Sequence, residues 1–149
     1  MSAFELREMT ADDVEQVYPL ETRLFPEDAW PRDMFEAEVA QTDTRRYWVA
    51  EADGRVVGYA GMMCVLPIAD VQTIAVVPEF EGRGIGTALL EAMIGESRAR
   101  GADNLLLEVR EDNPRAQQLY TRHGFEQIHV RRNYYPGGVS ALIMELRLA

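Results

Sequence analysis

Apolar and polar positions follow strand-like and helix-like spacings in turn along this chain. Strands are predicted where apolar residues alternate with polar ones or run continuously between turn residues. These segments are 4–7, 46–51, 56–66, 71–77, 105–109, 125–133 and 141–147. Helices are predicted where apolar residues recur every three to four positions, at 10–24, 31–40, 85–100 and 113–123. This order predicts an α/β fold, with helices covering both faces of one mixed sheet.

Residues that cap helices and form turns mark several of these boundaries. Thr10 and Asp13 have the spacing of a capping box at the start of the first helix. Asn113 followed by Pro114 is typical of an N-cap with proline in the first turn, and Gly124 is typical of the end of that helix. Residues 52–55 contain Asp-Gly, which predicts a hairpin between two strands.

Length and charge limit the classes of protein to consider. With 149 residues, of which 47% are hydrophobic, the chain can bury a core as one domain, 1–149, without disulfides. Its net charge is −10, and all fifteen basic residues are arginine. Residues 1–53 hold 14 acidic residues but only 5 arginines. A protein that binds nucleic acid through phosphates needs the opposite sign, so we expect no nucleic-acid partner and favour a basic one.

The single cysteine, Cys64, cannot form an internal disulfide, which favours a reducing compartment. Its apolar neighbours at 62–66 indicate a small buried hydrophobic residue rather than a nucleophile. With two histidines in the chain, no cluster has the spacing of a metal site. Residues 1–5 lack the pattern of a secretion signal, and the longest uncharged stretch, 56–69, is too short to span a bilayer. We therefore expect a cytoplasmic protein with no metal and no membrane contact.

A glycine-rich segment, 82–87, joins the strand at 71–77 to the helix that follows it. Its three glycines let the backbone approach a ligand, and the N–H groups at a helix N-terminus favour an anion such as phosphate. The segment has neither the Gly-Lys-Ser/Thr of a Walker loop nor the glycine spacing of a Rossmann loop. From the glycines alone, a phosphate loop and an ordinary strand-to-helix turn are equally good interpretations.

Two further residues are candidates for acid–base chemistry. Glu108 interrupts the apolar strand 105–109, where we expect a desolvated carboxylate of the kind that serves as a general base. The alternative is a structural ion pair with a neighbouring arginine such as Arg110. Tyr120 lies on the apolar face of its helix, so a core tyrosine with a satisfied hydroxyl is the alternative to a catalytic one.

The strand Thr73–Val76, the proline at 78 and the Gly-x-Gly loop together resemble the acetyl-CoA loop of the GNAT acyltransferases. The resemblance continues through Leu107-Glu108-Val109, Asn113–Ala116 and Leu119–Phe125, in the family's order from about residue 70 to 126. It implies the GNAT fold, with a mostly antiparallel mixed sheet, and an enzyme that uses acetyl-CoA. Residues 131–136, with Glu108 and Tyr120, are similar to the members that acetylate the N-terminal alanine of a small-subunit ribosomal protein.

The resemblance also implies roles for individual residues. Glu108 would accept a proton from the attacking amine, and Tyr120 would donate one to the departing thiolate. The backbone of Ile74, Ala75 and Val76 would hold the pantetheine arm, and Asn113 would bind that arm near the thioester. The pyrophosphate would be bound by Gly82, Arg83, Gly84, Ile85, Gly86 and Thr87.

Two details depart from the simplest version of this site. Glu81 stands where the family has Gln or Arg, and Arg83 would have to supply the missing positive charge. The ordinary pKa of tyrosine, about 10, lies above that of a thiol, about 8.5, so proton donation to a thiolate costs about 2 kcal/mol. Tyr120 must therefore either have a lowered pKa or act chiefly by hydrogen bonding to the thiolate.

The acceptor implied by the resemblance is the N-terminal amine of a basic ribosomal protein, and the acidic first third of the chain favours such a partner. Two alternatives stay open. One is a GNAT enzyme that acts on a lysine side chain or a small polyamine. The other is a module that binds an acyl-CoA without turnover, for which Glu81 is the hint.

Overall fold

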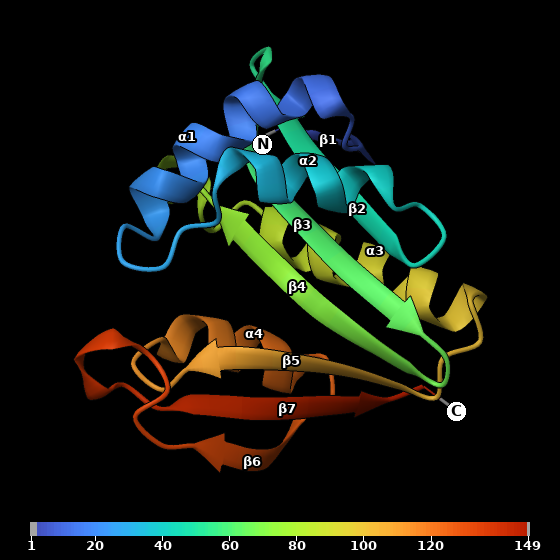
Figure 1. Ribbon diagram of the computed structural model, residues 1–149, viewed down its shortest axis with the longest axis vertical. Helices are drawn as coiled ribbons and strands as arrows, with labels where there is room; N and C mark the ends of the chain where they lie inside the picture. The colour runs from blue at the N-terminus through green and yellow to red at the C-terminus, as the bar shows by residue number, and fades with distance from the viewer. Residues whose placement is uncertain (1–2, 149) are drawn as a thin grey trace. The chain divides into compact units, whose positions relative to one another are not determined.

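The computed structural model describes residues 3–148. The strands of this part of the chain are β1 (Glu5–Glu8), β2 (Arg45–Ala52), β3 (Arg55–Val65), β4 (Ile68–Val76), β5 (Asn104–Arg110), β6 (Glu126–Arg131) and β7 (Ala141–Arg147). Its α-helices are α1 (Val14–Leu24), α2 (Arg32–Ala40), α3 (Ile85–Ala99) and α4 (Pro114–Arg122) (Figure 1). The predicted order of strands and helices is confirmed. No helix within residues 3–148 is long and apolar enough to cross a membrane.

The strands hydrogen-bond in the order β1-β2-β3-β4-β5-β7-β6. Strands β4 and β5 run parallel, whereas β1 with β2, β2 with β3, β5 with β7 and β6 with β7 are antiparallel. The predicted mixed, mostly antiparallel sheet is therefore confirmed. The hairpin between β2 and β3 turns at Asp53 (φ 53°) and Gly54 (φ 75°), as expected when both central residues of a two-residue turn have positive φ.

Most predicted boundaries lie within one residue of the observed ones, and three differ by more. Strand β4 begins at Ile68 rather than at residue 71, because Ile68, Ala69 and Asp70 pair in register with residues 104–106 of β5. Strand β6 ends at Arg131 rather than at 133, and Asn133 has a left-handed φ of 53°. The first helix begins with a short 3-10 turn over residues 11–13, which carries the predicted capping box.

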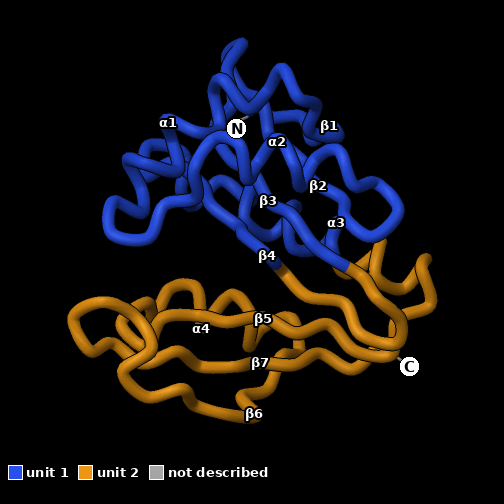
Figure 2. Tube along the Cα trace, in the orientation of Figure 1, with its two compact units in different colours: residues 1–63, 72–93 blue, residues 64–71, 94–149 orange. Residues whose placement is uncertain are grey.

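The chain divides into two compact units (Figure 2). Unit 1 contains residues 1–63 and 72–93, and unit 2 contains residues 64–71 and 94–149. The prediction that residues 1–149 form one domain stays a prediction.

In unit 1, opposite faces of β2 and β3 pack against different helices (Figure 1). Tyr47 and Tyr59 lie in one buried cluster with Val17 of α1 and Phe35 of α2. On the other face, a Cβ atom built at Gly58 would lie 3.1 Å from Ile85 Cγ2 and 3.5 Å from Leu89 Cδ1, so α3 packs closely against β3 there. The predicted cover of both sheet faces is confirmed within this unit.

In unit 2, one face of the β5–β7 pair forms the core. Leu105 and Leu107 of β5 are buried and pair with Leu146 and Met144 of β7. Helix α4 lies behind these strands in Figure 1. On the opposite face, Leu106 is only partly buried and Glu108 is exposed. This second face carries the acid–base candidate.

Candidate active site

The glycine-rich segment of unit 1 has a backbone that suits an anion site. Gly82 and Gly84 have φ values of 77° and 86°, which a residue with a Cβ atom rarely adopts. The first hydrogen bond of α3 is donated by Ala88 N to Gly84 O over 3.0 Å. The N–H groups of residues 85–87 therefore have no partner within the helix and are available at its N-terminus.

Neighbouring side chains fix the start of this helix and place positive charge beside it. Ile85 is 1% exposed and is held against β3. Phe80 is contacted by two guanidinium groups, with Arg83 Cζ 4.5 Å and Arg55 Cζ 5.2 Å from the ring centroid. Phe80 therefore holds the guanidinium group of the loop residue Arg83 in place. Arg55 adds a second positive charge beside this ring, and the sequence analysis did not identify it. The ring stacking of arginine leaves its N–H groups free to bind an anion.

The β4 residues singled out for the pantetheine arm lie in the same unit as the loop. Ala75 is 8% exposed and belongs to the cluster under α1 and α2, whereas Ile74 and Val76 are partly buried. The N–H group of Val77, which follows these residues, is not available to a ligand because it donates a hydrogen bond to Val57 O over 2.9 Å. The side chain of Ala75 thus stabilises the core, so any ligand contact of Ala75 has to be made by its backbone.

In unit 2, Glu108 is more exposed than the sequence indicates. Its side chain is 36% exposed, and Oε1 lies 3.3 Å from an Nη atom of Arg131. The expectation of a desolvated carboxylate is therefore wrong, because only the face of β5 that carries Leu105 and Leu107 is covered. The alternative, an ion pair with an arginine, is present, but the partner is Arg131 and not Arg110, which forms an ion pair with Asp112 over 3.0 Å.

Tyr120 is buried with an unused hydroxyl. The residue is 5% exposed, and its ring centroid lies 5.9 Å from that of Phe125. Burial, and to a lesser degree the neighbouring Tyr135, raises the pKa of Tyr120. The possibility of a lowered pKa is therefore wrong, and hydrogen bonding becomes the chemistry that this phenol can offer. Its hydroxyl makes no hydrogen bond to any of residues 3–148.

Asn113 is the N-cap of α4, as predicted, and the cap uses the oxygen of its side-chain amide but not the nitrogen. Asn113 Oδ1 accepts a hydrogen bond from Ala116 N over 3.2 Å, which satisfies one of the free N–H groups of the first turn. The Nδ2 donor of the amide has no partner among residues 3–148. Asn113 can therefore cap the helix and donate a hydrogen bond to a ligand at the same time.

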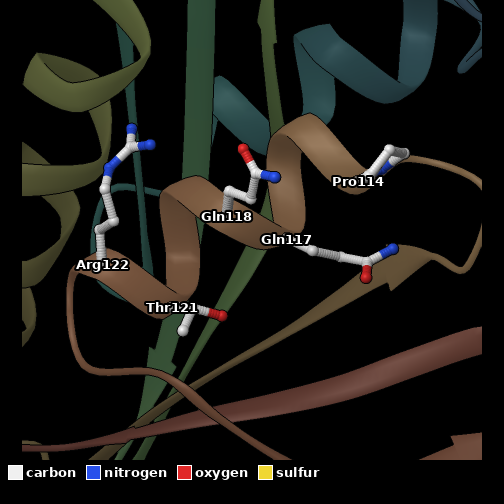
Figure 3. A pocket seen from close by; sticks show the side chains of 5 residues that line it. All are labelled: Pro114, Gln117, Gln118, Thr121 and Arg122. Carbon is white, nitrogen blue, oxygen red and sulfur yellow. The ribbon is translucent and has the colours of Figure 1, made fainter.

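One side of α4 borders an open hollow of about 520 Å³ that is lined mostly by polar side chains (Figure 3). The lining residues are Pro114, Gln117, Gln118, Thr121 and Arg122. Gln118 and Arg122 are one turn apart and point to the same side of the helix in Figure 3. Gln117 Nε2 donates to Arg110 O and to Glu111 O, each over 3.0 Å, and so ties α4 to the end of β5.

Sequence reasoning missed a second carboxylate beside Glu108. Asp70 lies in the part of β4 that belongs to unit 2, and burial, together with the negative charge of Glu108, raises the pKa of Asp70. The signal in the sequence is an acidic residue between two apolar ones, Ala69 and Val71. It was missed because the strand was predicted to begin at residue 71, one residue after Asp70. Within residues 3–148, no group of three His, Cys, Asp or Glu side chains could hold a metal ion. Cys64 is buried, as predicted, and burial raises the pKa of its thiol.

Comparison with known proteins identifies the family. A model of the acetyltransferase (GNAT) family matches residues 14–125. The ribosomal protein bS18-alanine N-acetyltransferase of Salmonella typhimurium is 44% identical over 101 residues, which are 66% of this chain and 68% of that protein. The N-alpha-acetyltransferase RimI of Mycobacterium tuberculosis is 39% identical over 132 residues, which are 85% of this chain and 81% of that protein.

The fold agrees with this result. The crystal structure of the ribosomal-protein-S18-alanine N-acetyltransferase from Escherichia coli has a TM-score of 0.88 and 32% sequence identity to this chain. The match covers 99% of this chain and 95% of the Escherichia coli chain. Because the family model spans most of the sequence and both relatives exceed 35% identity, this chain belongs to the GNAT family of acetyltransferases.

Proposed function

We propose that this protein transfers the acetyl group of acetyl-CoA to the N-terminal α-amine of a protein, and that the acceptor begins with the alanine of a small-subunit ribosomal protein. The observation that carries the proposal is the similarity to two relatives. One, at 44% identity, is named as a ribosomal protein bS18-alanine N-acetyltransferase, and the other, at 39% identity, as an N-alpha-acetyltransferase. The reaction would take place in the cytoplasm, where ribosomal proteins are made.

In this proposal, Glu108 accepts a proton from the acceptor's ammonium group. The free amine then forms a bond to the carbonyl carbon of the thioester, the nitrogen loses its second proton to water, and the carbon–sulfur bond breaks as the amide forms. Tyr120 donates a hydrogen bond to the thiolate as negative charge develops on the sulfur, and the proton needed to make the thiol comes finally from water. The raised pKa of Tyr120 favours this role over full proton donation.

The acetyl-CoA contacts are proposed residue by residue. The N–H groups at Gly82–Thr87 bind the pyrophosphate, where the positive φ of two glycines and the start of α3 suit an anion. Arg83 adds a positive charge that offsets the acidic Glu81. The backbone of Ile74–Val76 holds the pantetheine arm, and the unused Nδ2 of Asn113 contacts that arm near the thioester.

Acid–base chemistry favours an α-amine over a lysine side chain. The pKa of an α-amine is about 7.7–8.0, whereas that of lysine is about 10.4. Deprotonating lysine near pH 7 therefore costs roughly 3 kcal/mol more. A single, partly exposed carboxylate such as Glu108 is therefore a more suitable base for an α-amine than for a lysine side chain.

The charge of the chain favours a basic acceptor. The first 53 residues hold 14 acidic residues and 5 arginines, and several of the arginines are already engaged in ion pairs, such as Arg7 with Asp13 and Arg32 with Glu15. An arginine-rich acceptor segment would be attracted to this part of the chain. Attraction of this kind weakens as salt screens it.

The test compares three peptides with acetyl-CoA, and mass spectrometry locates the acetyl group. One peptide begins with alanine and has basic residues at positions three to six, the second has acidic residues there, and the third has a blocked N-terminus and a free lysine. We expect the first to have the highest kcat/KM and to lose most of its advantage at high salt. A preference for the blocked lysine peptide would replace the N-terminal acceptor with a side-chain one. Binding of acetyl-CoA with no acetylation of any peptide or small amine would favour a binding module.

The catalytic roles are tested by Glu108→Gln and Tyr120→Phe. General acid–base groups contribute about 10²- to 10⁴-fold to rate. We expect Glu108→Gln to lower kcat within this range and Tyr120→Phe to lower it less, with melting temperatures within a few degrees of the wild type. A Glu108→Gln enzyme with wild-type kcat at every pH would show that the proton acceptor is another group.

A further inference from the structure

Asp70 and Glu108 lie on the same face of the unit 2 sheet. Asp70 of β4 pairs with Leu106 of β5 in a parallel register, and Glu108 is two residues further along β5. Side chains two positions apart in a strand point to the same face. From the strand rise and spacing, the Cα atoms of these two acids are about 8 Å apart. Two carboxylates at this separation can both contact one small cation placed between them.

The Asp70 carboxylate has no compensating partner in the protein. It is half-buried, and it forms no hydrogen bond or ion pair with any of residues 3–148. The nearby Arg131 forms an ion pair with Glu108, and its Cζ atom lies 5.3 Å from the centroid of the Tyr134 ring. Burial and the charge of Glu108 both oppose ionisation of Asp70, and its pKa is raised accordingly.

An arrangement of this kind is unfavourable in the free protein. A partly buried anion beside a second anion loses hydration and is repelled, and neither cost is recovered until a cation arrives. Neighbouring ionisable groups with a perturbed pKa are common where a protein binds a charged ligand. This face of the sheet is accessible to a ligand at Glu108, because Glu108 is exposed and Leu106 is only partly buried.

We propose that Asp70 binds the protonated α-amine of the acceptor beside Glu108, so that two carboxylates hold the ammonium before Glu108 takes its proton. This inference rests on the proposed function, which brings a cation to Glu108. An α-amine is mostly protonated near pH 7, and an ammonium group has three N–H donors, enough to contact both acids. Asp70 is a positioning residue here and transfers no proton.

The test is Asp70→Asn, which keeps the shape of the side chain and removes its charge. We expect the KM for an Ala-start peptide to rise about tenfold, while kcat at saturating peptide and the KM for acetyl-CoA each change less than threefold. Without substrate, we expect the variant to melt at a higher temperature than the wild type at pH 7. This gain should disappear near pH 3, because Asp70 is then protonated and neutral in the wild type as well.

Asp103→Asn is the matched control, since Asp103 is an exposed residue of the same unit. The hydrogen bonds of Asp103 with Pro67 O and Leu148 N are made by its backbone, so the substitution keeps them. We expect it to leave all three kinetic constants unchanged. An unchanged peptide KM in an active Asp70→Asn enzyme would overturn the role of Asp70 alone. A lower melting temperature at pH 7 would also overturn it, because Asp70 would then be stabilising the fold. Failure of the wild type to acetylate any α-amine would instead overturn the proposed function, and this inference with it.

Discussion

Two glycines of unit 1 provide a matched test of the phosphate loop. Gly84 lies in the loop and has a φ of 86°, and Gly54 lies in the β2–β3 hairpin and has a φ of 75°. A Cβ atom at either position would meet nothing within 4 Å. Replacing each with alanine therefore introduces the same backbone strain and no steric clash. The two variants differ in whether the backbone belongs to the proposed pyrophosphate site.

The size of each effect can be worked out separately. A left-handed conformation costs an L-residue roughly 1–2 kcal/mol. For a chain of this length, 1 kcal/mol lowers Tm by about 2–4 °C, so we expect both variants to melt roughly 2–8 °C lower. If Gly84→Ala relieves its strain by turning the peptide, one N–H bond to the pyrophosphate is lost. Hydrogen bonds to charged groups contribute about 1.5–3 kcal/mol, which predicts a loss of roughly tenfold to a hundredfold in acetyl-CoA affinity.

Calorimetric titration with acetyl-CoA and thermal unfolding by circular dichroism give the two measurements. We expect Gly54→Ala to lose stability and keep wild-type affinity, and Gly84→Ala to lose both. Wild-type affinity in a folded Gly84→Ala variant would refute the assignment of this loop to the pyrophosphate. Equal loss of affinity in both variants would show that general destabilisation, not the loop, weakens binding.

Three other substitutions test the fold. Gly61→Ala should destabilise the protein by about 1–3 kcal/mol, because the new Cβ atom would lie 1.9 Å from the ring of the buried Tyr47. Gly95 lies in an exposed part of α3, where a new Cβ atom would meet nothing within 4 Å, so Gly95→Ala should stabilise the protein by about 0.5–1 kcal/mol. Thermal unfolding measures both effects, and a change of Tm in the same direction for both variants would contradict this reasoning. The Arg7 guanidinium lowers the pKa of the buried Asp13, so this carboxylate stabilises the fold above about pH 4 and the effect is lost as the pH falls. Asp13→Asn should therefore lower Tm at pH 7 and by much less at pH 3, and an equal decrease at both values would exclude the ion pair as the cause.

The sequence alone was sufficient for the order of elements and for many of their ends. Apolar spacing and capping are properties of a few consecutive residues, so they can be recognised without knowing the rest of the fold. The Thr10–Asp13 capping box, the Asn113 cap and the hairpin turn at 53–54 all form as these short patterns predict. Recognition of the family likewise depended on short motifs in a fixed order.

The surroundings of the acid–base residues depended on contacts between distant parts of the chain. Strand β4 starts at Ile68 because it pairs with β5, some 36 residues further along, and only this pairing places Asp70 beside Glu108. Strand β7 lies between β5 and β6, which brings Arg131 rather than Arg110 to the Glu108 carboxylate. An apolar run such as 105–109 indicates a strand but does not say whether one face or both will be covered. Burial is decided by which elements pack on each face, and so only the tertiary structure revealed that Glu108 is exposed. The sequence placed Tyr120 on the apolar face of its helix, but only the structure showed that its hydroxyl is unused.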